Sequence, residues 1–177
     1  MHFPVPRVPR QPAPGTAGAG LTDELASAAA GARRRAQRDG DHQVDTAHLL
    51  HSLLEADPAV RTAFDGRTQV ARTLGYLVQR SIGYGLRWQV KAEDSGAFPA
   101  LRGAGPAGWS PSVVAAMEDA RHRAQRRGAA RVGGFDLLAA LAAGHDSRAV
   151  HVLQRAGVDT ARLAGRAEAL SQQVQQM

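Results

Sequence analysis

The chain has 177 residues, enough for one compact domain or for two small halves that share a core. It contains no cysteine, which excludes disulfides and thiolate metal sites, and no apolar run of about 18 residues, which excludes a transmembrane helix. The net charge of +6 is carried almost wholly by arginine, and the apolar residues are mainly alanine and leucine, which favour packed helices over sheets.

Residues 1–20 are predicted to form a disordered tail. Prolines between Pro4 and Pro14 restrict the backbone to extended conformations, and the glycines that follow loosen it. Such a segment buries too little apolar surface to offset the entropy lost on ordering. It also lacks the apolar stretch of a signal peptide, so we expect the protein to stay in the cytoplasm.

Segment 21–80 is predicted to contain four helices, because apolar residues recur in it at helical spacing. Thr22 is the candidate N-cap of the first helix, which can end at Gly40. The later helices begin, in chain order, at Asp45 or Thr46, at Asp57-Pro58, and close to Val70.

The connector, residues 81–108, is the segment whose structure is hardest to predict. Its beginning, Leu86 to Lys91, alternates apolar and polar residues like a short strand, and its end is rich in glycine and proline. A structureless loop of that length is uncommon inside a compact domain. We therefore expect a partly ordered loop packed by Trp88, with Phe98 as a further candidate.

Segment 109–177 is predicted to repeat the same order of four helices. Ser110-Pro111 opens the first of them, and Asp159 caps the last. The apolar residues of the second and third helices are Leu137, Leu138 and Leu141, followed by Ala149, Val150, Val152 and Leu153, with a stop at Gly157.

An internal duplication underlies this order, because residues 109–128 repeat residues 21–40 in register. Arg33, Arg35 and Arg38 stand opposite Arg121, Arg123 and Arg126. The spacing of about 88 residues exceeds the usual solenoid period of about 20 to 50 residues, so each copy must be a unit of several helices. We predict an all-α fold, a pseudo-twofold tandem repeat of two four-helix units that form one domain over residues 21–177.

Each repeat carries two short motifs in the same order. The openings are Leu21-Thr22-Asp23-Glu24-Leu25 and Trp109-Ser110-Pro111-Ser112-Val113. The second motif is Val44-Asp45-Thr46-Ala47-His48-Leu49-Leu50, with a more divergent copy at Val132-Gly133-Gly134-Phe135-Asp136-Leu137-Leu138. These motifs resemble the Phe-Thr-x-Arg-Ala opening and the Ile-Gly-Thr-Glu-His-Leu-Leu segment of the N-terminal domain of Clp ATPases such as ClpC, ClpA and ClpB.

The resemblance implies a tandem duplication of a four-helix unit that docks substrates and adaptor proteins. Clp ATPases hydrolyse ATP through a P-loop, Gly-x-x-x-x-Gly-Lys-Ser/Thr. The single lysine, Lys91, is followed by Ala92 and lacks those glycines. We therefore expect a free-standing N-domain that is neither an ATPase nor a protease and needs no cofactor.

The resemblance also suggests where a ligand would bind. ClpC relatives bind phosphorylated arginine through a Thr at each repeat's start and the Glu of each Gly-Thr-Glu-His segment. Thr22 and Ser110 keep the hydroxyls, but Ala47 and Phe135 stand at the glutamate positions, which argues against this ligand.

We expect instead an apolar groove near Leu21 and Trp109, flanked by Thr22 and Ser110. It would bind adaptor proteins, substrate peptides or a hydrophobic small molecule directed at Clp. The domain would then act as a decoy or regulator of Clp proteolysis, with the Clp ATPase among its candidate partners. Trp109 could equally be a packing residue at the entry of its helix.

Two other clusters are weaker candidates. An arginine face could bind anions, and the alternative function is an arginine-rich nucleic-acid-binding regulator, although no recognition-helix signature accompanies it. Arginine codons are G/C-rich, so its abundance is also typical of a high-GC, actinobacterial-like genome. The face comprises Arg33, Arg35, Arg38, Arg121, Arg123 and Arg126.

A metal site at His42, Asp45, His48 and His51 is conceivable, since residues three apart share a helical face. His48 falls on the histidine of the Clp motif, so we interpret it as an ordinary residue of a helix start. We predict no metal.

Overall fold

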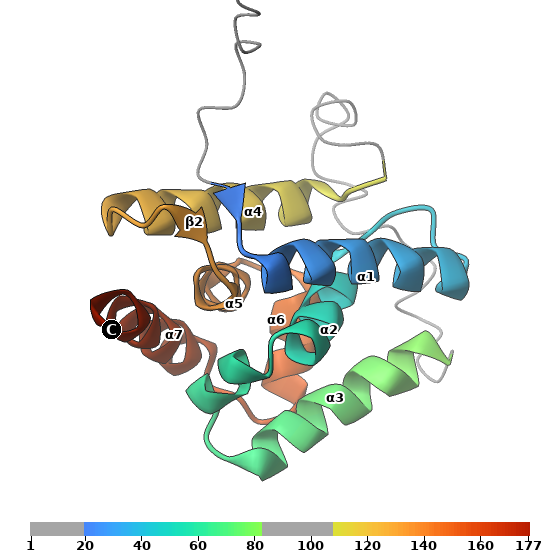
Figure 1. The fold of residues 1–177 in the computed structure, drawn as a ribbon. Coiled ribbons are helices and arrows are strands. Elements are labelled where there is room, and N and C mark those ends of the chain that lie inside the picture. Colours follow the sequence, from blue (N-terminus) through green and yellow to red (C-terminus); the bar gives the residue numbers. More distant parts are fainter. Residues whose placement is uncertain (1–19, 83–107) are drawn as a thin grey trace, which may run out of the picture.

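The computed structural model describes residues 20–82 and 108–177, which contain eight helices and two very short strands (Figure 1). The first repeat holds β1 (Gly20–Leu21), α1 (Asp23–Asp39), α2 (Thr46–Ala56), the 3-10 helix η1 (Pro58–Ala63) and α3 (Arg67–Ser81). The second holds α4 (Pro111–Arg126), β2 (Arg131–Val132), α5 (Gly134–Ala143), α6 (Arg148–Arg155) and α7 (Thr160–Gln176). The predicted all-α fold and the order of its helices are confirmed.

The ordered part of the chain begins one residue earlier than the sequence predicts. Gly20, which we assigned to the disordered tail, belongs to β1 because its backbone pairs with β2. The rest of the tail and most of the connector, with the predicted strand near Trp88, lie outside the described residues. Within the described part of the chain, no helix combines the length and the apolar character needed to cross a membrane.

The first helix of each repeat begins and ends in the same way. The Thr22 hydroxyl accepts the Leu25 backbone N–H at 3.3 Å, and the Ser110 hydroxyl accepts that of Val113 at 3.1 Å. Each satisfies an N–H group that the helix itself leaves unpaired. At the other end Gly40 takes φ 72°, a left-handed conformation that glycine adopts without steric cost. The predicted caps are therefore confirmed.

One core holds the two repeats together, and α2 and α5 lie at its centre (Figure 1). In that view α1 and α4 lie along the upper side and α3 and α7 along the lower side. The buried leucines of the two central helices belong to a single cluster, so neither repeat has a separate core. They are Leu49, Leu50, Leu53 and Leu54 in α2 and Leu137, Leu138 and Leu141 in α5.

Two short backbone pairings also join the repeats. β1 pairs in parallel with β2, with Leu21 opposite Val132, and Trp109 forms a parallel bridge with Val44. In the register of the duplication Leu21 corresponds to Trp109 and Val132 to Val44. The same contact is therefore made twice, each time between the start of one repeat and the segment before the second helix of the other.

Candidate functional site

Leu21 and Trp109 occupy equivalent positions at the two separate pairings, as the register predicts. Both side chains are half-buried and pack against the core. The guanidinium of Arg33 lies over the Trp109 ring, 5.1 Å from its centroid, which is cation–π geometry. The indole Nε1 of Trp109 is buried and has no hydrogen-bond partner among the described residues. Trp109 therefore packs against the core of the domain and is only partly exposed.

The positions that bind phosphorylated arginine in ClpC relatives are altered here. The hydroxyls of Thr22 and Ser110 are used as helix caps. Ala47 is fully buried in α2, and Phe135 is half-buried in α5. No carboxylate therefore stands at either glutamate position to meet a guanidinium.

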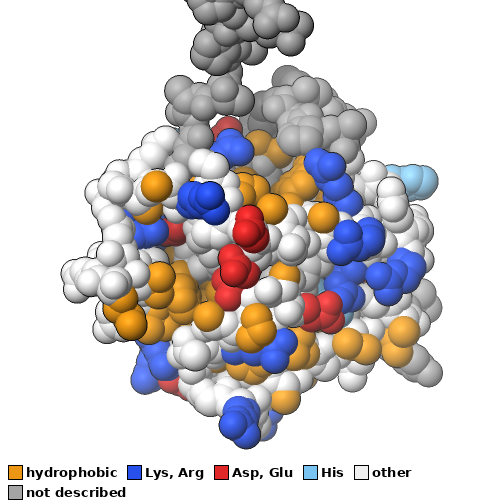
Figure 2. All heavy atoms as spheres, in the orientation of Figure 1, with side chains coloured by type: hydrophobic (Ala, Val, Ile, Leu, Met, Phe, Trp, Pro, Cys, Tyr) orange, Lys and Arg blue, Asp and Glu red, His pale blue; other side chains and the backbone are white. Residues whose placement is uncertain are grey.

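The six arginines of the proposed anion-binding face do not form one free surface. Arg35 forms an ion pair with Glu55, and Arg123 binds Asp119 at 2.9 Å and Glu168 at 3.1 Å. Figure 2 shows basic side chains gathered over the C-terminal part of α1 and separated from other basic groups by apolar and acidic ones. The arginines left exposed without an ion pair to a described residue are Arg33, which lies over the Trp109 ring, and Arg38, Arg121 and Arg126.

Asp45 ties the repeats together through a buried carboxylate. Its side chain accepts the His48 backbone N–H at 2.9 Å, binds Arg148 Nη1 of α6 at 2.6 Å, and forms an ion pair with Arg80 of α3. Burial alone would raise the pKa of Asp45. The hydrogen bond from His48 and the charge of Arg80 outweigh burial and hold this pKa well below its usual range. Asp45 is therefore a structural anion.

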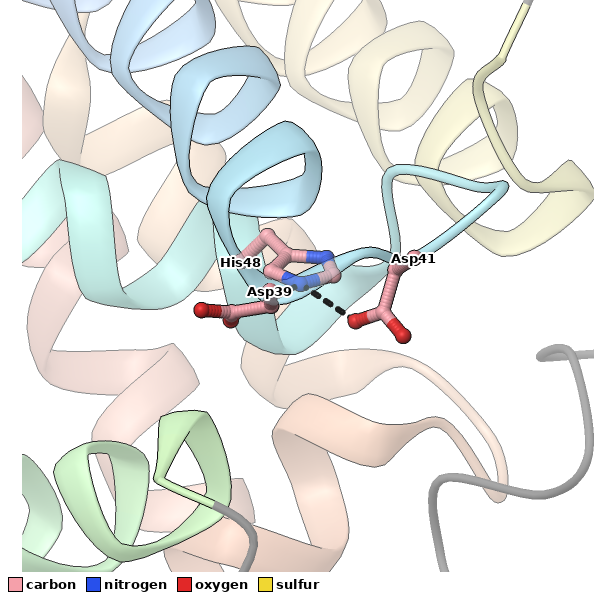
Figure 3. A group of neighbouring side chains, drawn as sticks. All are labelled: Asp39, Asp41 and His48. Atoms are coloured by element: carbon pink, nitrogen blue, oxygen red, sulfur yellow. Dashed lines mark ion pairs between the residues drawn. The ribbon is translucent and has the colours of Figure 1, made fainter.

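His48 points between two aspartates, Asp39 and Asp41, neither of which we grouped with it (Figure 3). Its Nε2 lies 2.9 Å from Asp41 Oδ2 and 3.6 Å from Asp39 Oδ2, and these three residues are close enough to hold a cation. However, Nδ1 accepts the Asp45 backbone N–H at 3.1 Å. A metal-bound histidine normally donates its other ring N–H, so the ring orientation fits a metal poorly.

The other two members of the suggested metal set lie elsewhere. His42 is exposed, whereas His51 is buried with its Nε2 3.4 Å from Glu55 Oε1. Burial, followed by the charge of Arg35, lowers the pKa of His51 to about 4, against the opposing effect of Glu55. His51 is thus a neutral core histidine at neutral pH, and the four residues that we considered as conceivable ligands do not form a cluster in the described part of the chain.

An apolar hollow of about 270 Å³ opens where α4, α5 and the turn before α6 meet. Ser112, Ala115 and Ala116 line it from α4, and Ala140 and Leu141 from α5. Small side chains leave room here for a larger apolar group. Sequence reasoning missed this hollow because its walls come from segments that only the fold brings together.

A second hollow, of about 170 Å³, lies where the C-terminal half of α4 meets α5 and α7. Its walls include Arg123, Arg126 and Arg127, together with Asp136 and Glu168. Both oxygens of the buried Asp136 carboxylate accept hydrogen bonds from the Arg127 guanidinium. Our candidates Arg123 and Arg126 therefore share a concave site, whereas Leu21 and Trp109 line neither of these two hollows.

Comparison with known proteins agrees with this architecture. No family model and no curated protein matches the chain. The crystal structure of the N-terminal domain of the caseinolytic protease associated chaperone ClpD from Arabidopsis thaliana is similar, with TM-score 0.63, 20% identity, and coverage of 85% of this chain and 94% of that one.

The crystal structure of the Hsp104 N-terminal domain from Candida albicans is also similar, with TM-score 0.64, 14% identity, and coverage of 86% of this chain and 91% of that one. At these identities the likeness establishes the fold. The chain therefore has the fold of a Clp N-terminal domain, as the sequence resemblance implied.

Proposed function

We propose that this chain is a non-catalytic docking domain for protein partners. The observation that carries the proposal is a fold shared, over most of both chains, with the N-terminal domains of two Clp-type chaperones. The absence of a P-loop from the sequence is consistent with a binding role. By binding adaptor proteins or unfolded substrates in the cytoplasm, the domain would act as a decoy or regulator beside a Clp unfoldase.

The alanine-lined hollow between α4 and α5 is the first candidate docking surface. It is concave and mainly apolar, and Ser112 and Ser147 are among its lining residues. An extended segment of an unfolded protein could insert an apolar side chain there. A hydrophobic small molecule would suit the same space.

The surface at Leu21 and Trp109 is the second candidate. Both residues keep an exposed face, and aromatic residues are enriched in binding hot spots. The Arg33 guanidinium covers one face of the indole, so a ligand would approach the rest of the ring.

Nucleic-acid binding is the competing function, and the ion pairs argue against it. Arg35 and Arg123 are already paired with carboxylates, and Figure 2 shows the basic side chains over the end of α1 separated from other basic groups by apolar and acidic ones. A nucleic-acid surface is expected to offer free cations to successive phosphates.

A salt series distinguishes the two functions. Fluorescence anisotropy would follow labelled unfolded casein and a labelled random-sequence DNA duplex from about 50 to 500 mM salt. We expect saturable casein binding that falls much less steeply with salt than duplex binding does, and only weak duplex binding. Strong duplex binding that falls steeply with salt, without casein binding, would refute the proposed function.

A further inference from the structure

The two hollows lie along the same faces of α4 and α5. On α4 the lining residues Ser112, Ala116, Asp119, Arg123 and Arg126 recur every three or four positions, so they form one stripe. On α5 the lining residues are Asp136 and Ala139 at the arginine hollow, and Ala140, Leu141 and Ala143 at the apolar one, so the two sets follow one another along the helix. Asp119 lines the apolar hollow and binds Arg123, which lines the other. A ligand lying along α4 would meet both.

The arginine hollow has one cation that is not neutralised by a described residue. Arg127 is held by Asp136, and Arg123 is shared between Asp119 and Glu168. Arg126 is exposed and forms no ion pair with any residue in the described ranges.

The spacing between the hollows suits a short extended peptide. Ala116 and Arg126 are separated along α4 by about 15 Å at the helical rise of about 1.5 Å per residue. An extended chain spans that distance in about four or five residues, at about 3.3 Å each.

We propose that α4 and α5 form a track for extended peptides that carry an apolar residue and an acidic residue four or five positions apart. The inference rests on the docking function proposed above and names its ligand chemistry. The apolar side chain occupies the alanine hollow, and the acidic side chain binds Arg126. Asp136 and Glu168 also line the hollow and would repel an anion there. A singly charged carboxylate is repelled less than a dianionic phosphate, so it is the better ligand. The net charge of +6 favours the approach of acidic partners.

Selection from a random dodecapeptide display library on the full chain tests this ligand class. We expect enrichment of peptides in which a leucine or aromatic residue stands four or five positions from an aspartate or glutamate. Displayed peptides have no free carboxyl terminus, so the enrichment reports acidic side chains. Binders without that pairing would overturn the track and leave the docking function intact. A library without binders would overturn both.

A charge swap on one selected peptide locates the contact. Arg126→Glu should weaken its affinity by about fivefold or more, and a lysine in place of the peptide's acid should restore it. Arg121→Glu makes the same charge change at another exposed position of α4 and should have a much smaller effect. Equal losses in the two variants, or no rescue by lysine, would contradict the proposed contact.

A second pair of variants tests the apolar end of the track. Ala115→Trp fills the hollow from an exposed position of α4 and should weaken binding of the same peptide at least about tenfold. Ala169→Trp, on an exposed position of α7, is the matched control. Unchanged affinity in Ala115→Trp, with the fold retained, would exclude the alanine hollow.

Discussion

Asp45 lies where α2, α3 and α6 meet, and two arginines share its buried carboxylate. We predict that Asp45→Asn lowers the free energy of unfolding by about 3 kcal/mol or more, because removing one partner leaves buried charge poorly compensated. Urea denaturation at pH 7 measures the change. Asp65→Asn, which breaks an exposed ion pair to Arg166, should cost at most about 1 kcal/mol. Similar losses for both variants would show that Asp45 is not a structural anchor.

His51 should make stability depend on pH. Its pKa falls from 6.5 to about 4 on folding, so the unfolded chain binds more protons between those values. Stability should therefore rise with pH across this window, by up to about 3 kcal/mol in total. Below about pH 4, His51 is protonated in both the folded and the unfolded chain, and its contribution to stability is lost.

The measurement is the free energy of unfolding from pH 4.5 to 7.5 for the wild type and His51→Gln. The variant should show a flatter profile, and His122→Gln, at an exposed position of α4, should follow the wild type. If the free energy of unfolding depends on pH in the same way in the wild type and in His51→Gln, His51 does not have the lowered pKa that we infer.

Trp109 can be tested for its two roles separately. Trp109→Ala should lower stability by about 2 kcal/mol, because the half-buried ring loses packing and its contact with Arg33. Trp109→Phe keeps a packed ring and should lower stability less. If the second docking surface is correct, both variants weaken binding of unfolded casein. Reduced stability with unchanged affinity in both would leave Trp109 a packing residue only.

At the scale of elements, the close approach of η1 to α5 explains why the second repeat has Gly134 where the first has Thr46. A Cβ on Gly134 would collide with the Asp57 carboxylate and lie 2.8 Å from Val60 Cγ1. We predict that Gly134→Ala destabilises the fold by about 1 to 3 kcal/mol. Gly165→Ala in α7, where nothing lies within 4 Å, should instead stabilise it by about 0.5 to 1 kcal/mol. If thermal denaturation shows that Gly134→Ala leaves the stability unchanged, η1 must be able to move away from the added methyl group.

The helices could be predicted from the sequence because their signals are local. Thr22, Ser110 and Asp159 cap the helices for which they were chosen, and Asp45, one of two candidates with Thr46, caps α2. The strands could not be predicted, since two residues show no periodicity and their pairing depends on the other repeat. The partners of Asp45 and the two hollows were missed for the same reason. Arg148 is 103 residues away in sequence, and no local pattern connects it to Asp45.

At the scale of the molecule, the duplicated unit has kept its geometry and changed its chemistry. Where the first repeat places Asp39 beside His48, the second places Arg127 beside Asp136 at the equivalent positions. An acidic residue at the end of α1 thus corresponds to a basic one at the end of α4, and Arg123, Arg126 and Arg127 line the arginine hollow of the track. The two repeats share one core and exchange backbone pairings, but we propose that the second supplies most of the docking surface.

The most direct test of this account is to map where a protein ligand contacts the chain. Backbone amide signals of the ¹⁵N-labelled protein would be recorded with and without unlabelled unfolded casein. The account predicts that signals move or broaden along α4 and in the turn before α6, at residues such as Ala115, Asp119 and His145. Signals that stay unchanged at saturating casein would contradict the docking function. Changes confined to α3 and η1 would contradict its location.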